Sequence, residues 1–372
     1  MHKKVIISLL VGGLMSAAML YLAFRNVQFA DLWSYMGTID YRWIFPTVLL
    51  IVLAFVLRVY RWRLILKEEI SLSFWQAFHP LMIGFMMNCV LPARAGELAR
   101  PAILTKEYTV PLGTGLATVA AERLFDTIMM ISLLVFTLLT VSIQPDLRVS
   151  IYGYELTTQS FQSAIIKIVG AGVVLSIGLT ALAFSVTRRW IIQLINLTAT
   201  FIGKMTPKNS KLVIKLSSML TAFIEGFASG LSLIGKPKRA LACVILSILV
   251  WLISALSYWV FSFGCPGVEL TFAEMTAVMV VVCFFIALPG VPGFWGLWEA
   301  GGVFALILFD VTGKQAVGFT LVNHAVNVFP VIIIGFISAL MTSVNFWQLT
   351  FNKNEAESKT FLEQRSAVRE PS

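Results

Sequence analysis

The sequence predicts an all-α polytopic membrane protein with about six to eight transmembrane helices. Of its 372 residues, 58% are apolar and only 13% are charged, whereas soluble proteins average about 45–50% apolar and about 25% charged. Several apolar runs reach the roughly 20 residues that a spanning helix needs. Two further apolar regions are interrupted by proline and glycine, and we expect them to form broken, re-entrant hairpins in inverted orientation.

The uninterrupted apolar runs define the predicted spans and their direction. The first run follows Lys3 and Lys4, exceeds the usual length of a signal peptide core and lacks a clear cleavage site, so we expect an uncleaved helix. Basic residues mark cytoplasmic ends, and they place the N-terminus, the end of the second run and the segment after residue 185 inside. The runs cover residues 5–24, 43–59, 124–141, 164–185, 241–263 and 317–344.

One integral-membrane domain is expected over residues 1–345. Within it, residues 190–239 form a predicted cytoplasmic amphipathic segment, because apolar side chains recur at helical spacing beside lysines. Residues 346–372 form a predicted flexible cytoplasmic tail, whose last 21 residues carry four basic and four acidic side chains. The amphipathic positions are Leu212, Leu216, Met219, Phe223 and Phe227.

The two interrupted regions, residues 71–120 and 271–310, resemble each other. Leu-Ser-Phe at 72–74 and Leu-Thr-Phe at 270–272 each precede a Leu-Pro pair, and the spacing from Phe to Leu is 17 residues in the first and 16 in the second. The orientation rule makes the first region start and end inside and the second start and end outside. Paired broken segments of this kind point to a transporter's binding site near the midplane.

The first break predicts a phosphate-binding cradle. It places Arg94, Glu97 and Arg100 inside an apolar region, where ionisable side chains are costly and point to function. A helix restarting at Gly96 would direct its N-terminal amides at an anion beside Arg94 or Arg100. The alternative is an interfacial loop with snorkelling arginines. Asn88 and Pro92 belong to the same predicted cavity or hinge.

A second charged cluster follows at Glu122, Arg123 and Asp126. Residues 122 and 126 share one helix face, and residue 123 lies one step around it. We expect a buried charge network that holds the Arg94 region or is coupled to it. The alternative is a cluster at the cytoplasmic end of a helix, where acidic residues near the N-terminus suit the helix dipole.

The second break combines prolines and glycines with two tryptophans and Glu299. A regular helix does not continue through such a segment. Its tryptophans could line a lipid path or act as ordinary interfacial aromatics, and Glu299 could bind an ammonium group or a proton, or pair with Arg94. The predicted cavity or hinge residues here are Pro289, Gly290, Pro292, Gly293, Trp295 and Trp298.

The remaining polar membrane residues carry weaker expectations. His324, with Asn323 and Asn327, and His79 are read first as hydrogen-bonded packing residues, with a ligand or proton role as the less favoured alternative. No cluster of cysteine and histidine predicts a metal site, and no nucleotide-binding motif is present. We therefore expect no metal and no cofactor, and the short basic loops argue against a nucleic-acid partner.

Taken in order, these motifs resemble the flippase-like transmembrane domain of lysylphosphatidylglycerol synthases, a family that also occurs as stand-alone membrane proteins. The resemblance rests on residues 58–63, 88–100, 122–126 and 288–299 and extends over roughly residues 5–345. It implies lipid translocation but does not identify the lipid, which we expect to be an anionic or aminoacylated phospholipid or a lipid-linked headgroup. The soluble synthase domain of the bifunctional members is not expected here, which argues against aminoacyl transfer.

The leading hypothesis is a lipid flippase of the bacterial inner membrane with both termini cytoplasmic. Arg94 and Arg100 would hold a lipid phosphate, and Glu97, Glu299 and the 122–126 cluster would line the path. One alternative is an intramembrane transferase acting on a phospholipid or lipid-linked sugar, with Glu97 or Asp126 as its base. Another is an accessory membrane subunit. A membrane phospholipid is the expected substrate, and a separately encoded lipid-modifying synthase or a second copy of the chain are candidate partners.

Overall fold

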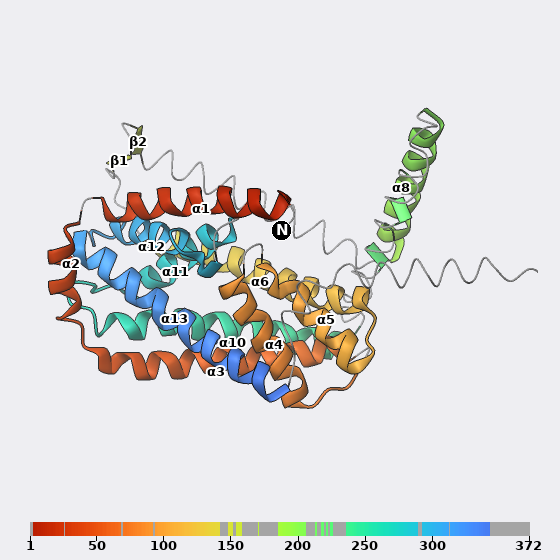
Figure 1. Ribbon diagram of the computed structural model, residues 1–372, viewed down its shortest axis with the longest axis horizontal. Helices are drawn as coiled ribbons and strands as arrows, with labels where there is room; N and C mark the ends of the chain where they lie inside the picture. The colour runs from red at the N-terminus through yellow and green to blue at the C-terminus, as the bar shows by residue number, and fades with distance from the viewer. Residues whose placement is uncertain are drawn as a thin grey trace, which may run out of the picture.

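The computed structural model describes residues 3–25, 27–67, 70–91, 94–141, 148–151, 154–157, 170, 185–205, 236–288, 292–311 and 313–342, with a few positions between 213 and 225. Apart from residues 148–157 and 185–205, this part of the chain is a helical bundle (Figure 1). The helices are α1 Lys3–Phe24, α2 Phe29–Met36, η1 Tyr41–Trp43, α3 Ile44–Leu66, α4 Phe74–Val90, α5 Gly96–Tyr108, α6 Leu112–Thr140, α8 Ser185–Met205, α10 Pro237–Ser262, α11 Phe272–Ala287, η5 Pro292–Phe294, α12 Leu297–Ile307 and α13 Gly313–Thr342.

The predicted all-α membrane fold is confirmed. Among the described residues, four helices are long and apolar enough to cross a bilayer, and two shorter apolar helices cover Gly13–Phe24 and Phe272–Ala287. Their apolar surfaces remain largely exposed toward the outside of the bundle, as expected for helices that face lipid. The four long helices cover Tyr41–Leu66, Leu112–Thr140, Pro237–Ser262 and Gly313–Thr342.

Helices α3 and α10 lie side by side along one edge of the bundle, and α13 crosses α4 (Figure 1). Loops from distant parts of the chain meet at one end, where the Asp40 amide donates to the Gly264 carbonyl at 2.8 Å and the Trp43 and Phe263 rings lie 5.2 Å apart. At the other end, the Arg63 guanidinium donates to the Leu72 carbonyl at 2.9 Å. The bundle therefore has two distinct ends, which we call the Asp40 end and the Leu72 end.

The first interrupted region forms a helical hairpin of α4 and α5 that starts and ends at the Leu72 end (Figure 1). Ser73 caps α4 with a reciprocal capping box to Gln76. With 17 residues, α4 is about 25 Å long, short of the roughly 30 Å hydrocarbon core. The two helices touch at Gly84 and Gly96: a side chain at Gly96 would overlap the Gly84 carbonyl, and one at Gly84 would overlap the Arg100 side chain.

The second interrupted region forms a matching hairpin of α11 and α12 at the Asp40 end (Figure 1). A capping box between Thr271 and Glu274 starts α11, which has 16 residues. The chain turns at Gly293 within η5 and again at Gly296 after it, with φ of 73° and 86°, a conformation that glycine adopts readily. The hairpins thus share their starting motif and their length, and they begin at opposite ends of the bundle.

Some boundaries differ from the predicted ones. Helix α6 begins at Leu112 rather than near residue 124, because its charged residues find partners inside the bundle and so do not interrupt it. A two-stranded antiparallel sheet lies in the predicted polar loop, formed by β1 Arg148–Ile151 and β2 Tyr154–Thr157. The predicted span over residues 164–185 falls almost entirely outside the described residues, as do the amphipathic positions Leu212, Leu216, Met219, Phe223 and Phe227 and the tail 346–372.

Candidate functional site: a cationic cavity between two broken hairpins

The tips of the two hairpins meet in the middle of the bundle. Arg94, in the first break, donates from Nη2 to the Ile286 carbonyl in the last turn of α11 at 2.8 Å. η5 of the second break packs on α4, and Gly293 lies close to the Cys89 carbonyl. Arg94 has a φ of 52°, which is uncommon for a residue with a side chain and is frequent at functional sites.

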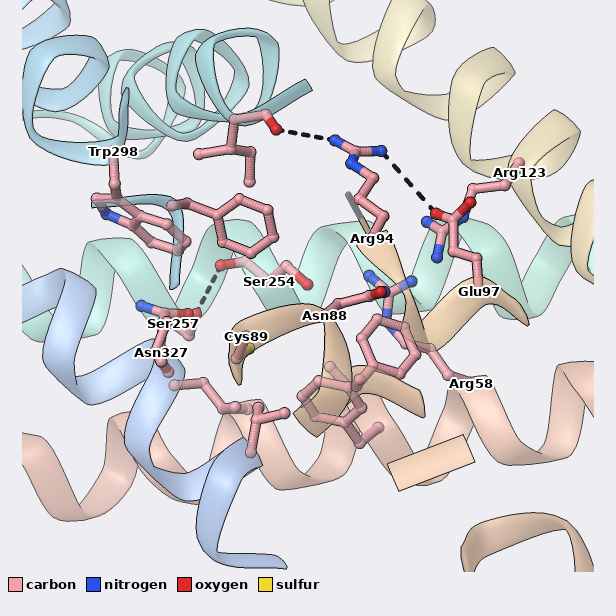
Figure 2. A pocket seen from close by; sticks show the side chains of 18 residues that line it. Arg58, Asn88, Cys89, Arg94, Glu97, Arg123, Ser254, Ser257, Trp298 and Asn327 are labelled. Atoms are coloured by element: carbon pink, nitrogen blue, oxygen red, sulfur yellow. Dashed lines mark hydrogen bonds and ion pairs between the residues drawn. The ribbon is translucent and has the colours of Figure 1, made fainter. Parts of the chain in front are cut away.

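A cavity of about 260 Å³ opens beside this meeting point (Figure 2). Its size suits a lipid headgroup better than a whole lipid, since pockets for drug-sized ligands start near 300 Å³. The lining comes from α3, α4, α5, α6, α10, α11, α12, α13 and both breaks. The lining residues are Ile51, Ala54, Phe55, Arg58, Phe85, Asn88, Cys89, Arg94, Glu97, Arg123, Ser254, Ser257, Ile286, Phe294, Trp298, Asn327, Val328 and Val331.

One side of the cavity is cationic. Arg58, Arg94 and Arg123 surround the single lining carboxylate, Glu97 (Figure 2). Arg123 approaches Glu97 at 3.1 Å and Arg94 approaches it at 3.9 Å. The lining as a whole carries three guanidinium groups and one carboxylate, so it favours an anion.

The opposite side is neutral and polar. Ser254, Ser257, Asn327 and Trp298 lie across the cavity from the arginines, with Asn88 between the two groups (Figure 2). The Asn88 side-chain oxygen is buried and has no hydrogen-bond partner. Buried polar atoms normally have a partner, so this oxygen is an acceptor that a hydroxyl or amine of a bound headgroup could satisfy.

A buried ion network lies behind the cationic side. Glu122 accepts a hydrogen bond from Arg100 Nη2 at 2.5 Å and lies 3.7 Å from Arg61. Arg61 also contacts Asp126 at 2.9 Å and donates to the Ser247 hydroxyl at 2.9 Å. Arg61 and Glu122 are 1% and 3% exposed, so these charges depend on one another to remain in the bundle.

Asp126 connects the network to the cavity. Its carboxylate lies 3.5 Å from Arg58 and 3.3 Å from Arg123, both of which line the cavity, and it accepts a hydrogen bond from the Trp251 indole at 3.3 Å. Across the network and the cavity, five guanidinium groups face three carboxylates in the described residues. Two positive charges are therefore in excess, and they lie on the cavity side.

A second polar centre lies under the second break. His324 on α13 contacts Glu299 on α12 through Nδ1 at 2.6 Å and the Gly293 carbonyl through Nε2 at 2.7 Å. The other Glu299 oxygen accepts from the Gly296 amide at 2.7 Å. His324 and Glu299 are 0% and 1% exposed. The Trp298 ring lies parallel to the imidazole, with centroids 4.6 Å apart.

The structure separates the predicted site residues into three places. Asn88, Arg94, Glu97, Arg123 and Trp298 line the cavity. Glu122 and Asp126 lie behind it, three or more turns into α6 rather than at a helix end. Pro292, Gly293, Trp295 and Glu299 surround or belong to the His324 centre. Pro92, Pro289 and Gly290 lie outside the described residues.

Two predicted roles do not match these positions. Arg100 does not line the cavity, because it is buried against Glu122 and its guanidinium lies 4.1 Å from the centre of the Trp62 ring. Glu299 does not meet Arg94, since its carboxylate is occupied by His324 and the Gly296 amide. Gly96 serves the close contact between α4 and α5.

The prediction from sequence missed Arg58 and Arg61, which it read as markers of a cytoplasmic end. Both lie well before the end of α3 and pair with Asp126. Their spacing of three residues on one face of an apolar helix was the available signal. No sequence pattern around His324 identified it as the partner of Glu299, because the two residues come from different helices.

Comparison with known proteins is consistent with this architecture. The chain is 24% identical over 343 residues to the protein named Glycosyltransferase AglD of Haloferax volcanii, covering 86% of this chain and 52% of that protein. It is 23% identical over 313 residues to UPF0104 membrane protein MJ1595 of Methanocaldococcus jannaschii, covering 78% of this chain and 84% of the relative. The chain thus spans about half the length of the Haloferax protein.

No solved structure is significantly similar to the chain. The family model described as the lysylphosphatidylglycerol synthase TM region matches residues 5–335. That match includes both hairpins, the ion network and the whole lining of the cavity. The chain belongs to the family of the lysylphosphatidylglycerol synthase transmembrane region.

Proposed function

We propose that the protein is a flippase that moves a phospholipid or lipid-linked headgroup with a negative charge across the cytoplasmic membrane. The observation that carries this proposal is the cavity between the two hairpin tips, lined by Arg58, Arg94 and Arg123 with Glu97 as the lining carboxylate. A phosphate group suits such a lining, because guanidinium groups bind phosphate oxygens through paired, charge-assisted hydrogen bonds. The acyl chains would remain in the bilayer.

The charge of the lining favours an anionic headgroup over an aminoacylated one. An aminoacyl group adds ammonium charges, and the three guanidinium groups of the lining would repel these charges. Glu97 is already engaged by Arg94 and Arg123, and the other acidic side chains of the network lie behind the lining. We therefore place an aminoacylated phospholipid second among the candidate substrates.

The hairpin arrangement supports alternating access. Each hairpin begins and ends at its own end of the bundle and has its tip at the cavity, so movement of either tip would open the cavity toward its own side. Orientation follows from charge. The helix ends at the Leu72 end are basic, with Arg63 and Lys67 at the end of α3, Lys106 at the end of α5, and Lys236, Lys238 and Arg239 at the start of α10. We place the Leu72 end and both termini in the cytoplasm.

The test is transport by the purified chain in liposomes. Fluorescent phosphatidylglycerol, lysyl-phosphatidylglycerol and a neutral glycolipid would be followed by quenching of the label in the outer leaflet. We expect transport in the order anionic, aminoacylated, neutral. Movement no faster than in protein-free liposomes for all three lipids would overturn the proposal.

A second candidate is a transferase acting on a lipid-linked sugar, and the printed name of the Haloferax relative is the observation that favours it. Of the two candidate bases, Asp126 is already engaged by three arginines and an indole, so its oxygens are occupied. Glu97 remains, half-exposed in the cavity. Product formation from labelled donors without lipid translocation would favour this candidate.

A further inference from the structure

The pair of Glu299 and His324 is the polar centre that lipid binding does not use. It is fully buried, and neither residue lines the cavity. Both ring nitrogens of His324 and both oxygens of Glu299 are engaged at 2.6–2.7 Å. A membrane-buried pair with so complete a set of short contacts holds a defined number of protons.

The contacts set that number. The Gly293 carbonyl can only accept, so Nε2 of His324 carries a hydrogen, and the Gly296 amide donates to one oxygen of Glu299. One further proton must lie between Nδ1 and the other carboxylate oxygen, because two acceptors do not approach to 2.6 Å. The bridging proton can lie on Nδ1, which gives an imidazolium and a carboxylate, or on the oxygen, which gives an imidazole and a carboxylic acid. The pair has a net charge of zero in both cases.

Loss of the bridging proton would leave a net negative charge in the bundle. Among the described residues, no lysine or arginine forms an ion pair or hydrogen bond with the pair, and an unpaired buried charge is costly. Four titratable or charged residues have contacts with the tryptophan or the backbone beside the pair. They are Tyr258 on α10, which stacks on Trp298, Cys283 on α11, which lies near Tyr258, Cys89 on α4, whose carbonyl lies close to Gly293, and Arg94, which holds the Ile286 carbonyl.

We propose that Glu299 and His324 form a proton-binding site that couples proton movement to lipid translocation, a proposal that rests on the proposed function. Both backbone partners of the pair, the Gly293 carbonyl and the Gly296 amide, belong to the second break. When this tip moves, the pair loses an acceptor for Nε2–H and a donor to its carboxylate. Proton affinity and tip position are therefore linked, and the linkage is reciprocal.

The same tip is connected to the cavity. Trp298 lies parallel to the His324 ring and also lines the cavity, and the Ile286 carbonyl at the start of the break is held by Arg94. An anion that binds Arg94 would break the hydrogen bond between Arg94 and this carbonyl, and the second break could then move. The pair would then exchange its bridging proton with water on the side that is open, so that one proton accompanies one anionic headgroup and offsets its charge.

The test uses proteoliposomes of the full chain with labelled phosphatidylglycerol and an entrapped pH-sensitive dye. We expect an imposed pH gradient to accelerate lipid movement in the wild type, and lipid movement to be accompanied by proton uptake. Glu299→Gln keeps the size and hydrogen-bonding capacity of the side chain but does not bind the proton. It should equilibrate lipid without a gradient effect and without proton uptake. His324→Gln should do the same.

Matched controls are Glu274→Gln, on the exposed start of the same hairpin, and His79→Gln, on the other hairpin. Both should keep the gradient effect. An equal gradient effect in wild type, Glu299→Gln and His324→Gln would overturn the coupling while leaving the flippase intact. Absence of lipid movement in the wild type at any gradient would overturn both. If His324→Gln does not fold, the gradient effect and proton uptake measured for the isosteric Glu299→Gln variant decide whether the pair couples protons to lipid movement.

Discussion

Arg94 in the break of the first hairpin donates a hydrogen bond of 2.8 Å to the carbonyl of Ile286, 192 residues further along the chain. That carbonyl belongs to the last turn of α11, where backbone oxygens have no partner within the helix. The bond therefore satisfies a helix end at membrane depth and joins the two hairpins at the cavity. It also uses one arm of the guanidinium while another faces Glu97.

Arg94→Lys should impair transport of an anionic lipid almost as strongly as Arg94→Ala. Lysine keeps the charge but loses the planar fork that reaches Ile286, Glu97 and a phosphate together. Initial rates in liposomes for an anionic and a neutral lipid would measure the effect. Arg42→Lys, on an exposed arginine paired with Asp40, is the matched control and should behave as wild type. Full activity of Arg94→Lys would exclude a bidentate role.

Surface basicity is tested separately by replacing Lys204, Lys208 and Lys211 with glutamine. These residues belong to the predicted amphipathic segment, and each contributes at most about 1 kcal/mol of attraction to anionic lipid. The triple variant should keep the selectivity for anionic over neutral lipid in the same liposome assay. Loss of selectivity would move recognition from the cavity to the membrane surface.

Glu122→Ala should destabilise the protein by about 3–5 kcal/mol, because it leaves Arg61 and Arg100 buried without their shared partner. Thermal unfolding of the detergent-solubilised protein would show the loss as a lower midpoint. Glu107→Ala removes an exposed glutamate from α5 and should change the midpoint little. Equal midpoints for the two variants would mean that the ion network does not stabilise the bundle.

Arg100→Lys should lower stability without changing which lipid is transported. The guanidinium is buried between Glu122 and the face of Trp62, a stacked arrangement that an ammonium group does not reproduce. Unfolding midpoint and lipid selectivity would be measured on the same preparation. A change of selectivity at unchanged stability would restore Arg100 as a headgroup ligand.

Gly96→Ala should prevent the first hairpin from closing, since the new methyl group would overlap the Gly84 carbonyl. We expect low yield of folded protein and no transport. Gly113→Ala, in the first turn of α6, meets nothing within 4 Å and should be neutral or stabilising by up to about 1 kcal/mol, because alanine favours helix. Fluorescence-detected gel filtration would compare the two, and a monodisperse, active Gly96→Ala variant would contradict the close contact.

Labelling of single cysteines introduced into a chain without native cysteines tests the orientation. Cysteines replacing Lys67 and Lys236 should react only with a permeant reagent in intact cells, whereas cysteines replacing Asp40 and Lys314 should react with an impermeant one. The expectation follows from the basic excess at the Leu72 end. If all four cysteines reacted with the impermeant reagent, or if only those at positions 67 and 236 did, the inverted orientation of the hairpins would be contradicted.

The sequence by itself determined the membrane class, the two proline- and glycine-broken hairpins and three of the charged residues that line the cavity, Arg94, Glu97 and Arg123. These properties follow from local chemistry. Apolar runs of spanning length require helices in lipid, and the segments around Leu91 and Leu288 cannot continue one. The similar starts of α4 and α11 were visible for the same reason, since a capping box is encoded within four residues.

Only the tertiary structure decided which charges meet. Arg61 and Ser247 are 186 residues apart and the Trp251 indole reaches Asp126 across 125 residues, so their pairing depends on how α3, α6 and α10 pack. The same packing placed Arg100 behind the cavity and joined Glu299 to His324 instead of Arg94. A buried charge needs a partner, but nothing within one helix specifies which residue of another helix supplies it.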